Sequence, residues 1–512
     1  MTLPARFSPR FAALHTIFDA AQLFDSGRRE AWLFSLLAVL LVIVRSAPFL
    51  LWGHIDFDSD QAIVGLMAKH LSEFRAFPLF FYDQNYMLGV QSWFIAPLFW
   101  IARPSIAVLK APLVVLNIIA ALLLMRGVTG WLGLRPAVGF VAALPFIVPT
   151  PVVAGTFLQT LGSSGVEPIL YVLFLWMLRQ RPFAFGALLV FGFLHREFTA
   201  YAVPALVAVH ATDRSLWGAG APRWLMRMAA GSALVWLVID DLRLHVDGLS
   251  LWLQAQMLGN HACVELAQLP SRFLLALEFA LPILAGGKTM ALNEYGMRSS
   301  AVVGSSLIGW TAGGAVLLMA VRLAWLWRLR RAPSIGFALY LALVGCCALA
   351  GYALACSYAY PITRYFNMAV LLPIGCFAAF MAWEPSARAR GAAVVVFVLW
   401  GGANLVDNGR VIREAYVNPQ PDPHRELTEF LLSNQIRYAR AGYWDAYVVD
   451  FLSRERVIVG SYGPARIPEY ERAVDENQDT AVHIERLPCE GWAKVAAWCI
   501  QLPVPRADEG PR

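Results

Sequence analysis

Long apolar runs recur along this chain and constrain its fold more than any other feature of the sequence. An α-helix needs about 20 apolar residues to cross a bilayer. Hydrophobic residues make up 58% of the 512 residues and charged residues 15%, whereas soluble domains carry about 25% charged residues. Lipid must therefore cover much of the surface. About eleven runs are candidate spans, and they begin near Ala31, Ser105, Pro136, Val166, Pro182, Glu197, Met226, Ala301, Ile335, Tyr365 and Gly391.

The arginines between these runs predict the orientation of the helices. Loops rich in Arg and Lys stay on the cytoplasmic side, and the arginine groups share one face if eleven runs span. We therefore expect the N-terminus inside and the C-terminus outside, with the run at Ala31 as an uncleaved signal anchor. Short basic clusters between apolar runs do not indicate a nucleic-acid partner. The groups are Arg28/Arg29, Arg126/Arg135, Arg179/Arg181, Arg214/Arg223/Arg227, Arg322/Arg328/Arg330/Arg331 and Arg388/Arg390.

The expected fold class is an α-helical polytopic membrane protein with a small C-terminal α/β domain outside. We expect three parts: a cytoplasmic segment 1–30, a transmembrane domain 31–407 with long outer loops 53–104 and 241–300, and an outer domain 408–512. Helices are predicted at 61–71 and 91–102 in the first loop, and interfacial helices in the second. In the outer domain, helices at 425–434, 444–453 and 467–476 should alternate with strands at 436–441, 456–461 and 480–487. Outside the cytoplasm, Cys489 and Cys499 could form a disulfide or stay free thiols.

Three carboxylates stand at alternate positions directly after the first run, at Asp56, Asp58 and Asp60. Like charges this close raise one another's pKa, and a carboxylate with a raised pKa can act as a general base toward a hydroxyl. The segment could instead cap the following helix, through Asp60 or Ser59, or form a solvated turn. A calcium loop fits poorly, because the sixth position is Gln61 rather than Gly and the twelfth is not Glu. A divalent cation at Asp56 and Asp58 stays open.

The first outer loop resembles that of bacterial GT-C-fold glycosyltransferases, the polytopic relatives of protein O-mannosyltransferases and of the lipid A aminoarabinose transferase. The resemblance lies in D-S-D-Q-A-I-V-G-L-M-A-K-H-L and F-P-L-F-F-Y-D-Q-N-Y-M-L-G-V-Q, in Thr363-Arg364-Tyr365 before a late run, and in Tyr443–Tyr447 of the outer domain. It covers the first loop, the late helices and the tail. The sequence departs from the family's Asp-Glu pair at Asp60-Gln61, from its Tyr-Gly-Gln at Tyr82-Asp83-Gln84, and from a frequent Glu at Gln91.

The resemblance implies a bacterial inner-membrane enzyme that moves a sugar from a polyprenyl-phosphate donor to an outer hydroxyl on a glycan, lipid or protein. It implies a single inverting displacement with Asp60 as general base and no cofactor. Cations must hold the leaving phosphate; Arg364 is the first candidate, although it could also be an interfacial anchor. Other candidate cations are Lys69, Arg196, Arg243 and His245, and candidate substrate contacts are Asp58, Tyr82, Asp83 and Tyr86.

Two other functions fit the same sequence. A transporter or flippase for a lipid-linked saccharide would need charged residues near the midplane, and Arg45 lies inside the first run. The second alternative is a non-catalytic protein that has the same fold, because Gln61 and Gln91 stand where the resembled family carries acidic residues. Within Tyr443–Tyr447 we expect the aromatic side chains to fill the core of the outer domain rather than to recognise an acceptor.

Overall fold

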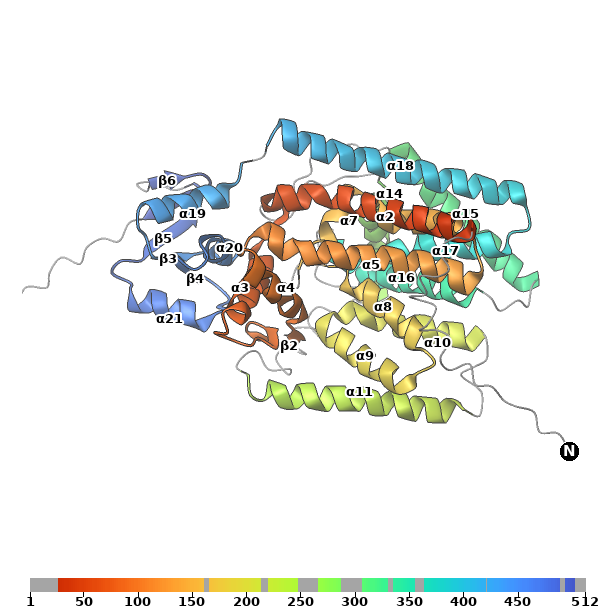
Figure 1. Cartoon of the computed structure of the whole chain (residues 1–512), viewed down its shortest axis with the longest axis horizontal. Helices are drawn as coiled ribbons and strands as arrows, with labels where there is room; N and C mark the ends of the chain where they lie inside the picture. The colour runs from red at the N-terminus through yellow and green to blue at the C-terminus, as the bar shows by residue number, and fades with distance from the viewer. Residues whose placement is uncertain are drawn as a thin grey trace, which may run out of the picture.

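A helical body carries a small α/β domain at one end in the computed structural model (Figure 1). The body contains the long helices, several of which run side by side, and the chain's last part forms the α/β domain. The structure describes residues 26–160, 165–212, 220–246, 266–286, 306–329, 335–354, 363–419, 421–488 and 493–501.

Five helices of the body are long and apolar enough to cross a membrane. They are α2 (Ser26–Leu51), α5 (Ile106–Leu132), α15 (Ser306–Leu329), α16 (Gly336–Leu354) and α18 (Ala387–Val417). The other expected spans are also helical: α6 (Pro136–Ile147) with α7 (Pro151–Thr156), α8 (Glu167–Leu178), α9 (Pro182–His195), α10 (Ala202–Thr212), α11 (Ala221–Arg243) and α17 (Leu371–Trp383). The expected fold class, an α-helical polytopic membrane protein with a C-terminal α/β domain, is confirmed.

Small residues let the helices of the body pack closely, as is usual between membrane helices. A Cβ atom on Gly375 of α17 would collide with the backbone of α16, and one on Gly345 of α16 would collide with Leu372. In the same way, a Cβ atom on Gly186 of α9 would collide with the backbone of α11, and one on Gly231 of α11 would collide with the backbone of α9. The two short runs at 182–195 and 197–212 were expected as a tilted pair or a broken helix. They form α9 and α10, which are joined by a short 3₁₀ segment, Glu197–Tyr201, at the start of the second run.

The first outer loop folds into a compact layer on the body. It contains a 3₁₀ turn (Gly53–Asp56), α3 (Ser59–Ser72), a hairpin of β1 (Phe80–Phe81) and β2 (Gln84–Leu88), and α4 (Val90–Ile101). Both expected helices are present, and the hairpin was not expected from the sequence. Helix α3 is buried from Gln61 to His70. Gly65 lets the ring of Phe451 from the outer domain and Leu109 of α5 both approach its backbone closely. The layer thereby fixes the outer domain to the body.

The outer domain has a five-stranded sheet in the order β4-β3-β5-β7-β6. Strands β3 (Tyr438–Ala441), β4 (Ile458–Ser461) and β5 (Val482–Arg486) are parallel, and β6 (Ala493–Val495) and β7 (Trp498–Gln501) add an antiparallel hairpin. Helices α19 (Pro423–Ser433), α20 (Tyr443–Ser453) and α21 (Pro468–Glu476) lie where the sequence predicts them. Cys499 is disulfide-bonded, and Cys489, the expected partner, lies outside the described residues.

Only part of the second long loop is described. Residues 266–286 contain α13 (Leu269–Leu275) and α14 (Leu281–Ala285). Ile283 is fully buried and its carbonyl accepts a hydrogen bond from Thr150 Oγ1 at 2.8 Å, so α14 packs into the body. The remaining interfacial helices expected between 241 and 300 lie outside the described residues.

Candidate active site

Helix α3 begins with a capping residue that positions the acidic segment. Asp58 has an extended backbone, and its Oδ1 accepts a hydrogen bond from the backbone N–H of Gln61 at 2.9 Å. The expectation that Asp60 or Ser59 forms this cap is therefore wrong. Ser59 Oγ instead donates to the carbonyl of Tyr443 at 2.6 Å, which leaves the Asp60 carboxylate in the first turn without a capping role.

The carboxylate of Asp60 faces the start of α20 in the outer domain. Tyr443 donates its phenolic hydrogen to Asp60 Oδ1 at 2.6 Å. Burial, and then the like charge of Asp58, raise the pKa of Asp60 to about 6, although the Tyr443 hydrogen bond and the charges of Arg364 and Arg466 oppose the rise. A carboxylate with a pKa near 6 is ionised at neutral pH and is still basic enough to take a proton.

Arg466, which the sequence did not single out, brings a guanidinium group from the outer domain to this carboxylate. Its backbone N–H donates to Tyr447 at 2.6 Å, and its Nη1 lies 3.5 Å from Asp83 Oδ2. The Gln84 amide, oriented with its oxygen toward donors, accepts from both terminal nitrogens at 3.0 and 2.7 Å. The Arg466 side chain is 12% exposed. Arg466 therefore ties the β1–β2 hairpin to the outer domain beside Asp60.

Tyr86 belongs to the same group of charges. Burial raises its pKa to about 12, and the charges of Arg466, Glu197, Asp60 and Arg364 all act on it. Asp83 has a left-handed backbone, with φ of 58°, which turns its carboxylate toward Arg466. Burial raises the pKa of Asp83 and the charge and hydrogen bond of Arg466 oppose this. The hairpin thus supplies an acid and a phenol to the group around Asp60.

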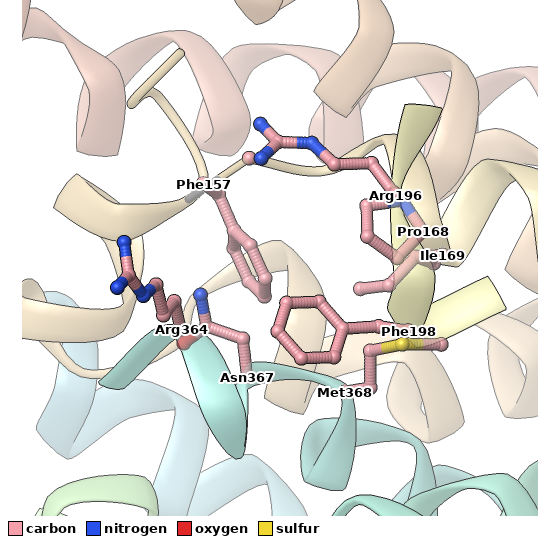
Figure 2. A pocket seen from close by; sticks show the side chains of 9 residues that line it. Phe157, Pro168, Ile169, Arg196, Phe198, Arg364, Asn367 and Met368 are labelled. Atoms are coloured by element: carbon pink, nitrogen blue, oxygen red, sulfur yellow. The ribbon is translucent and has the colours of Figure 1, made fainter. Parts of the chain in front are cut away.

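Beside this group, Arg364 and Arg196 line a small cavity of about 10 Å³. In Figure 2 the rings of Phe157 and Phe198 converge on the space between the two arginines. Pro168, Ile169 and Met368 supply further apolar wall, and Asn367 a further polar group. The positive charge of Arg364 interacts electrostatically with both the Asp60 carboxylate and the Arg196 guanidinium group. Cations and apolar side chains share this wall, which is the arrangement that an amphiphilic phosphate requires.

Glu167, also missed from the sequence, holds Arg196 at this cavity. Glu167 is the first residue of α8 and is 4% exposed. Its Oε2 lies 3.7 Å from Arg196 Nη2, and Gln91 donates a hydrogen bond to its Oε1. The resembled family often carries Glu at the position of Gln91. Here the carboxylate next to Gln91 belongs to Glu167 and comes from another helix, α8. An acid at the start of an apolar run is the signal that could have identified it.

Four candidate residues serve contacts away from Asp60. Lys69 forms an ion pair with Glu455 of the outer domain, and Tyr82 hydrogen-bonds to His70 Nδ1 at 2.7 Å. Arg243 donates to the carbonyl of Asn85 at 2.7 Å and pairs with Asp240 at 2.9 Å. Exposed His245 contacts the carbonyl of Asp241 at the end of α11, at 2.8 Å. The structure brings together Asp60, Asp58, Asp83, Tyr86, Arg196 and Arg364, whereas the other four candidates make the contacts given above.

Asp56 is engaged in a buried polar cluster. Gln159 donates to its Oδ1 at 2.5 Å, and Lys110 Nζ donates to its carbonyl at 2.9 Å and lies 3.9 Å from its Oδ2. Burial raises the pKa of Asp56 to about 6, and the opposite charge of Lys110 counters this. Asp58 is occupied as a cap. Within the described ranges, no group of three or more His, Cys, Asp or Glu side chains is arranged to hold a metal ion.

Comparisons with known proteins place the fold. No family model and no curated protein matches the sequence. The structure of ArnT from Cupriavidus metallidurans bound to undecaprenyl phosphate aligns with a TM-score of 0.54 at 10% identity, over 94% of this chain and 99% of that chain. The archaeal oligosaccharyltransferase AglB from Archaeoglobus fulgidus, in complex with an inhibitory peptide and a dolichol-phosphate, aligns with a TM-score of 0.45 at 11% identity, over 89% of this chain and 69% of that chain. The chain shares the GT-C fold of ArnT.

Proposed function

We propose that the protein is a membrane glycosyltransferase, which moves a sugar from a polyprenyl-phosphate donor to an acceptor hydroxyl outside the cytoplasm. The observation that carries this proposal is the Asp60 carboxylate, which has a pKa raised to about 6 and stands within the electrostatic reach of two guanidinium groups, Arg364 and Arg466. A base next to cations is the combination that transfer from a phosphate to a hydroxyl requires.

The side chains that line the small cavity between Arg196 and Arg364 have the chemistry that the donor's phosphate and the first part of its apolar tail require. Arginine can bind a phosphate through two parallel hydrogen bonds, and Phe157, Phe198 and Met368 offer apolar contact. The ArnT structure with the same fold contains undecaprenyl phosphate, which supports a donor of this class. Asp58 and Asp83 lie on the Asp60 side, where we expect the sugar and the acceptor.

The proposed reaction is one inverting displacement. The acceptor oxygen attacks the anomeric carbon and loses its proton to Asp60. The bond between that carbon and the phosphate oxygen breaks, and the electron pair leaves with the polyprenyl phosphate. Arg364 and Arg196 hold the charge that develops on the leaving group. Tyr443 donates to the ionised carboxylate and so keeps its second oxygen available for the proton.

We propose that this site faces the periplasm of a bacterial inner membrane. Arg28 and Arg29 lie at the start of α2, and Arg388 and Arg390 at the start of α18. The outer domain and helix α3, whose first turn contains Asp60, lie at the other ends of these helices (Figure 1). The positive-inside rule puts the arginine-rich ends in the cytoplasm.

Complementation of a deletion strain tests the proposal. The strain would carry the wild-type gene, Asp60→Asn, or the control Asp241→Asn, whose side chain is exposed at the end of α11. Mass analysis of envelope glycans and lipids should show one sugar modification that the wild type and the control restore and Asp60→Asn does not. Detergent-extracted Asp60→Asn must elute like the wild type and be no less stable.

The same strains separate the two rival functions. Full restoration of the modification by Asp60→Asn would contradict the base role and favour a non-catalytic protein of this fold. A flippase would change the leaflet in which the lipid-linked sugar accumulates without forming a new sugar bond. Arg45, the charged residue expected for such transport, is fully buried, donates to Asn117 Oδ1 at 2.7 Å and lies over the rings of Phe146 and Phe157, so it braces the body.

A further inference from the structure

A second, larger hollow lies between the body and the outer domain, at the C-terminal end of α20, whereas Tyr443 at the N-terminal end contacts Asp60. It has a volume of about 380 Å³ and is open to solvent. The body contributes the outer end of α2 and the start of α5, and the outer domain contributes α19, the end of α20 and the turn that follows it. Phe451 at this hollow is eight residues after Tyr443, about 12 Å along the helix. The hollow is therefore separate from the cavity between Arg196 and Arg364.

The side of the hollow formed by the outer domain is positively charged. Arg425, Arg454 and Arg456 line it, against the single carboxylate of Glu429. Arg425 is paired with Asp422 at 3.1 Å. Arg454 donates through Nε to the carbonyl of Pro104 at 3.2 Å, and Arg456 through Nε to that of Ser453 at 3.1 Å. Across the described part of the chain neither Arg454 nor Arg456 has a carboxylate partner, so their terminal nitrogens are available to an anion.

The side formed by the body contains His54 and Ser105 together with apolar helix ends that lie at the edge of the membrane. Leu50 and Leu51 end α2, and Ile106 and Ala107 begin α5, both of which are membrane-crossing helices. Leu51 is 71% exposed. A ligand in the hollow would therefore meet guanidinium groups at one end and the hydrocarbon boundary at the other.

We propose that this hollow binds the phosphate headgroup of an anionic phospholipid from the outer leaflet. Charge complementarity favours a phosphate, and the apolar ends of α2 and α5 favour one that carries acyl chains over a free phosphate ion. The bound lipid bridges the outer domain and the body. Because the same helix α20 carries Tyr443 to Asp60 at its other end, the lipid also steadies the contact with that carboxylate. The binding itself does not depend on the proposed transfer reaction.

Lipid binding by the purified full chain tests the proposal. The chain would be exchanged into neutral phosphatidylcholine nanodiscs and titrated with phosphatidylglycerol, with bound lipid counted by native mass spectrometry. The test variant combines Arg454→Asn with Arg456→Gln. Asn suits the left-handed backbone at 454, where φ is 56°. The matched control is Arg472→Gln, an arginine of the same domain that is 71% exposed and lies outside the hollow.

We expect phosphatidylglycerol to bind the wild type and the control alike, and the double variant at least about 10-fold more weakly. The charge-retaining pair Arg454→Lys with Arg456→Lys should keep most of the affinity, which guards against a folding defect in the first variant. Equal affinity of the double variant would overturn the proposal. So would inorganic phosphate displacing phosphatidylglycerol at equal concentration, because the hollow would then select free phosphate rather than a lipid.

Discussion

Helix α3 contacts the outer domain at both of its ends, and each contact contains one carboxylate. The surroundings shift the pKa values of these two carboxylates in opposite directions. At the N-terminal end, Asp60 accepts a hydrogen bond from Tyr443, and its pKa is raised to about 6. At the C-terminal end, Glu455 receives Lys69, His70 at 3.0 Å, Arg75 at 2.6 Å and Tyr470 at 2.7 Å. Burial raises the pKa of Glu455, but His70, Lys69 and Arg75 outweigh it and hold the pKa well below its usual range.

This difference separates a group that holds the structure from one that is available for chemistry. Several charged donors around a carboxylate lower its pKa, so that it is a weak base, and they also fix its position. A buried carboxylate with few donors keeps a high pKa and costs stability when ionised, which is the usual state of a catalytic acid or base. One helix therefore docks the outer domain with its last turn and presents a base with its first turn.

The largest expected effect is on folding, at Glu455. Glu455→Gln leaves Lys69, His70 and Arg75 without their counter-charge and should lower the free energy of unfolding by about 3–5 kcal/mol, as when one partner of a buried ion pair is removed. Thermal or denaturant unfolding in detergent would measure it, with Glu469→Gln, 69% exposed, as the control. A decrease in the free energy of unfolding below about 1 kcal/mol would contradict the structural role assigned to Glu455.

This stability should depend on pH in a defined direction. Because the folded pKa of Glu455 is lower than in the unfolded chain, its contribution is present above the unfolded pKa of about 4.3 and is lost as the pH falls below it. Wild-type unfolding midpoints should therefore drop on acidification more steeply than those of Glu455→Gln. Parallel curves would contradict the docking role.

At Asp60 the sign of the stability effect is reversed. The folded pKa of about 6 lies above the unfolded value, so the protonated form stabilises the fold at low pH and this contribution is lost as the pH rises through 6. Asp60→Asn should thus be more stable than the wild type at about pH 8, by about 1–3 kcal/mol, with the gain vanishing below about pH 4. Unfolding midpoints of the two proteins across this range test it; a destabilised Asp60→Asn at pH 8 would count against a desolvated carboxylate.

Arg466 should affect the reaction more than the fold. Its charge lowers the pKa of Asp60 and favours the ionised base, so Arg466→Gln should reduce sugar transfer about 10-fold, while Arg466→Lys retains part of it. The rate would be followed as the loss of polyprenyl-phosphate sugar from a lipid extract of the parent strain. Arg472→Gln is the control in the same domain, and an equal loss in both variants would point to a general effect on the outer domain.

The smallest effect is expected at Asp58. Asn is as good a helix cap as Asp, so Asp58→Asn should unfold within about 0.5 kcal/mol of the wild type. Removal of the like charge should lower the pKa of Asp60 and shift the pH midpoint of transfer downward. An unchanged midpoint would mean that the two carboxylates do not interact.

The sequence predicted most of the fold because its signals are local. Each expected span corresponds to a helix, and α19 to β5 follow the expected alternation of helix and strand. The hairpins β1–β2 and β6–β7 were missed because two to five residues per strand carry too little periodicity. The site was predicted less well. Tyr443 and Arg466 are about four hundred residues from Asp60 in the sequence and act on it only in the folded protein. Lys69, a candidate phosphate ligand by sequence, finds its partner Glu455 only after the domain docks.

The pH dependence of sugar transfer tests the central claim most directly, through the wild type and Tyr443→Phe. We expect the wild-type rate to rise with pH around a midpoint near 6, the pKa of Asp60. Without the phenol that stabilises the ionised carboxylate, the midpoint of Tyr443→Phe should move upward by about one unit, with the rate at high pH largely retained. A wild-type rate that does not change between about pH 5 and 8, or a midpoint that stays in place in Tyr443→Phe, would show that Asp60 is not the base.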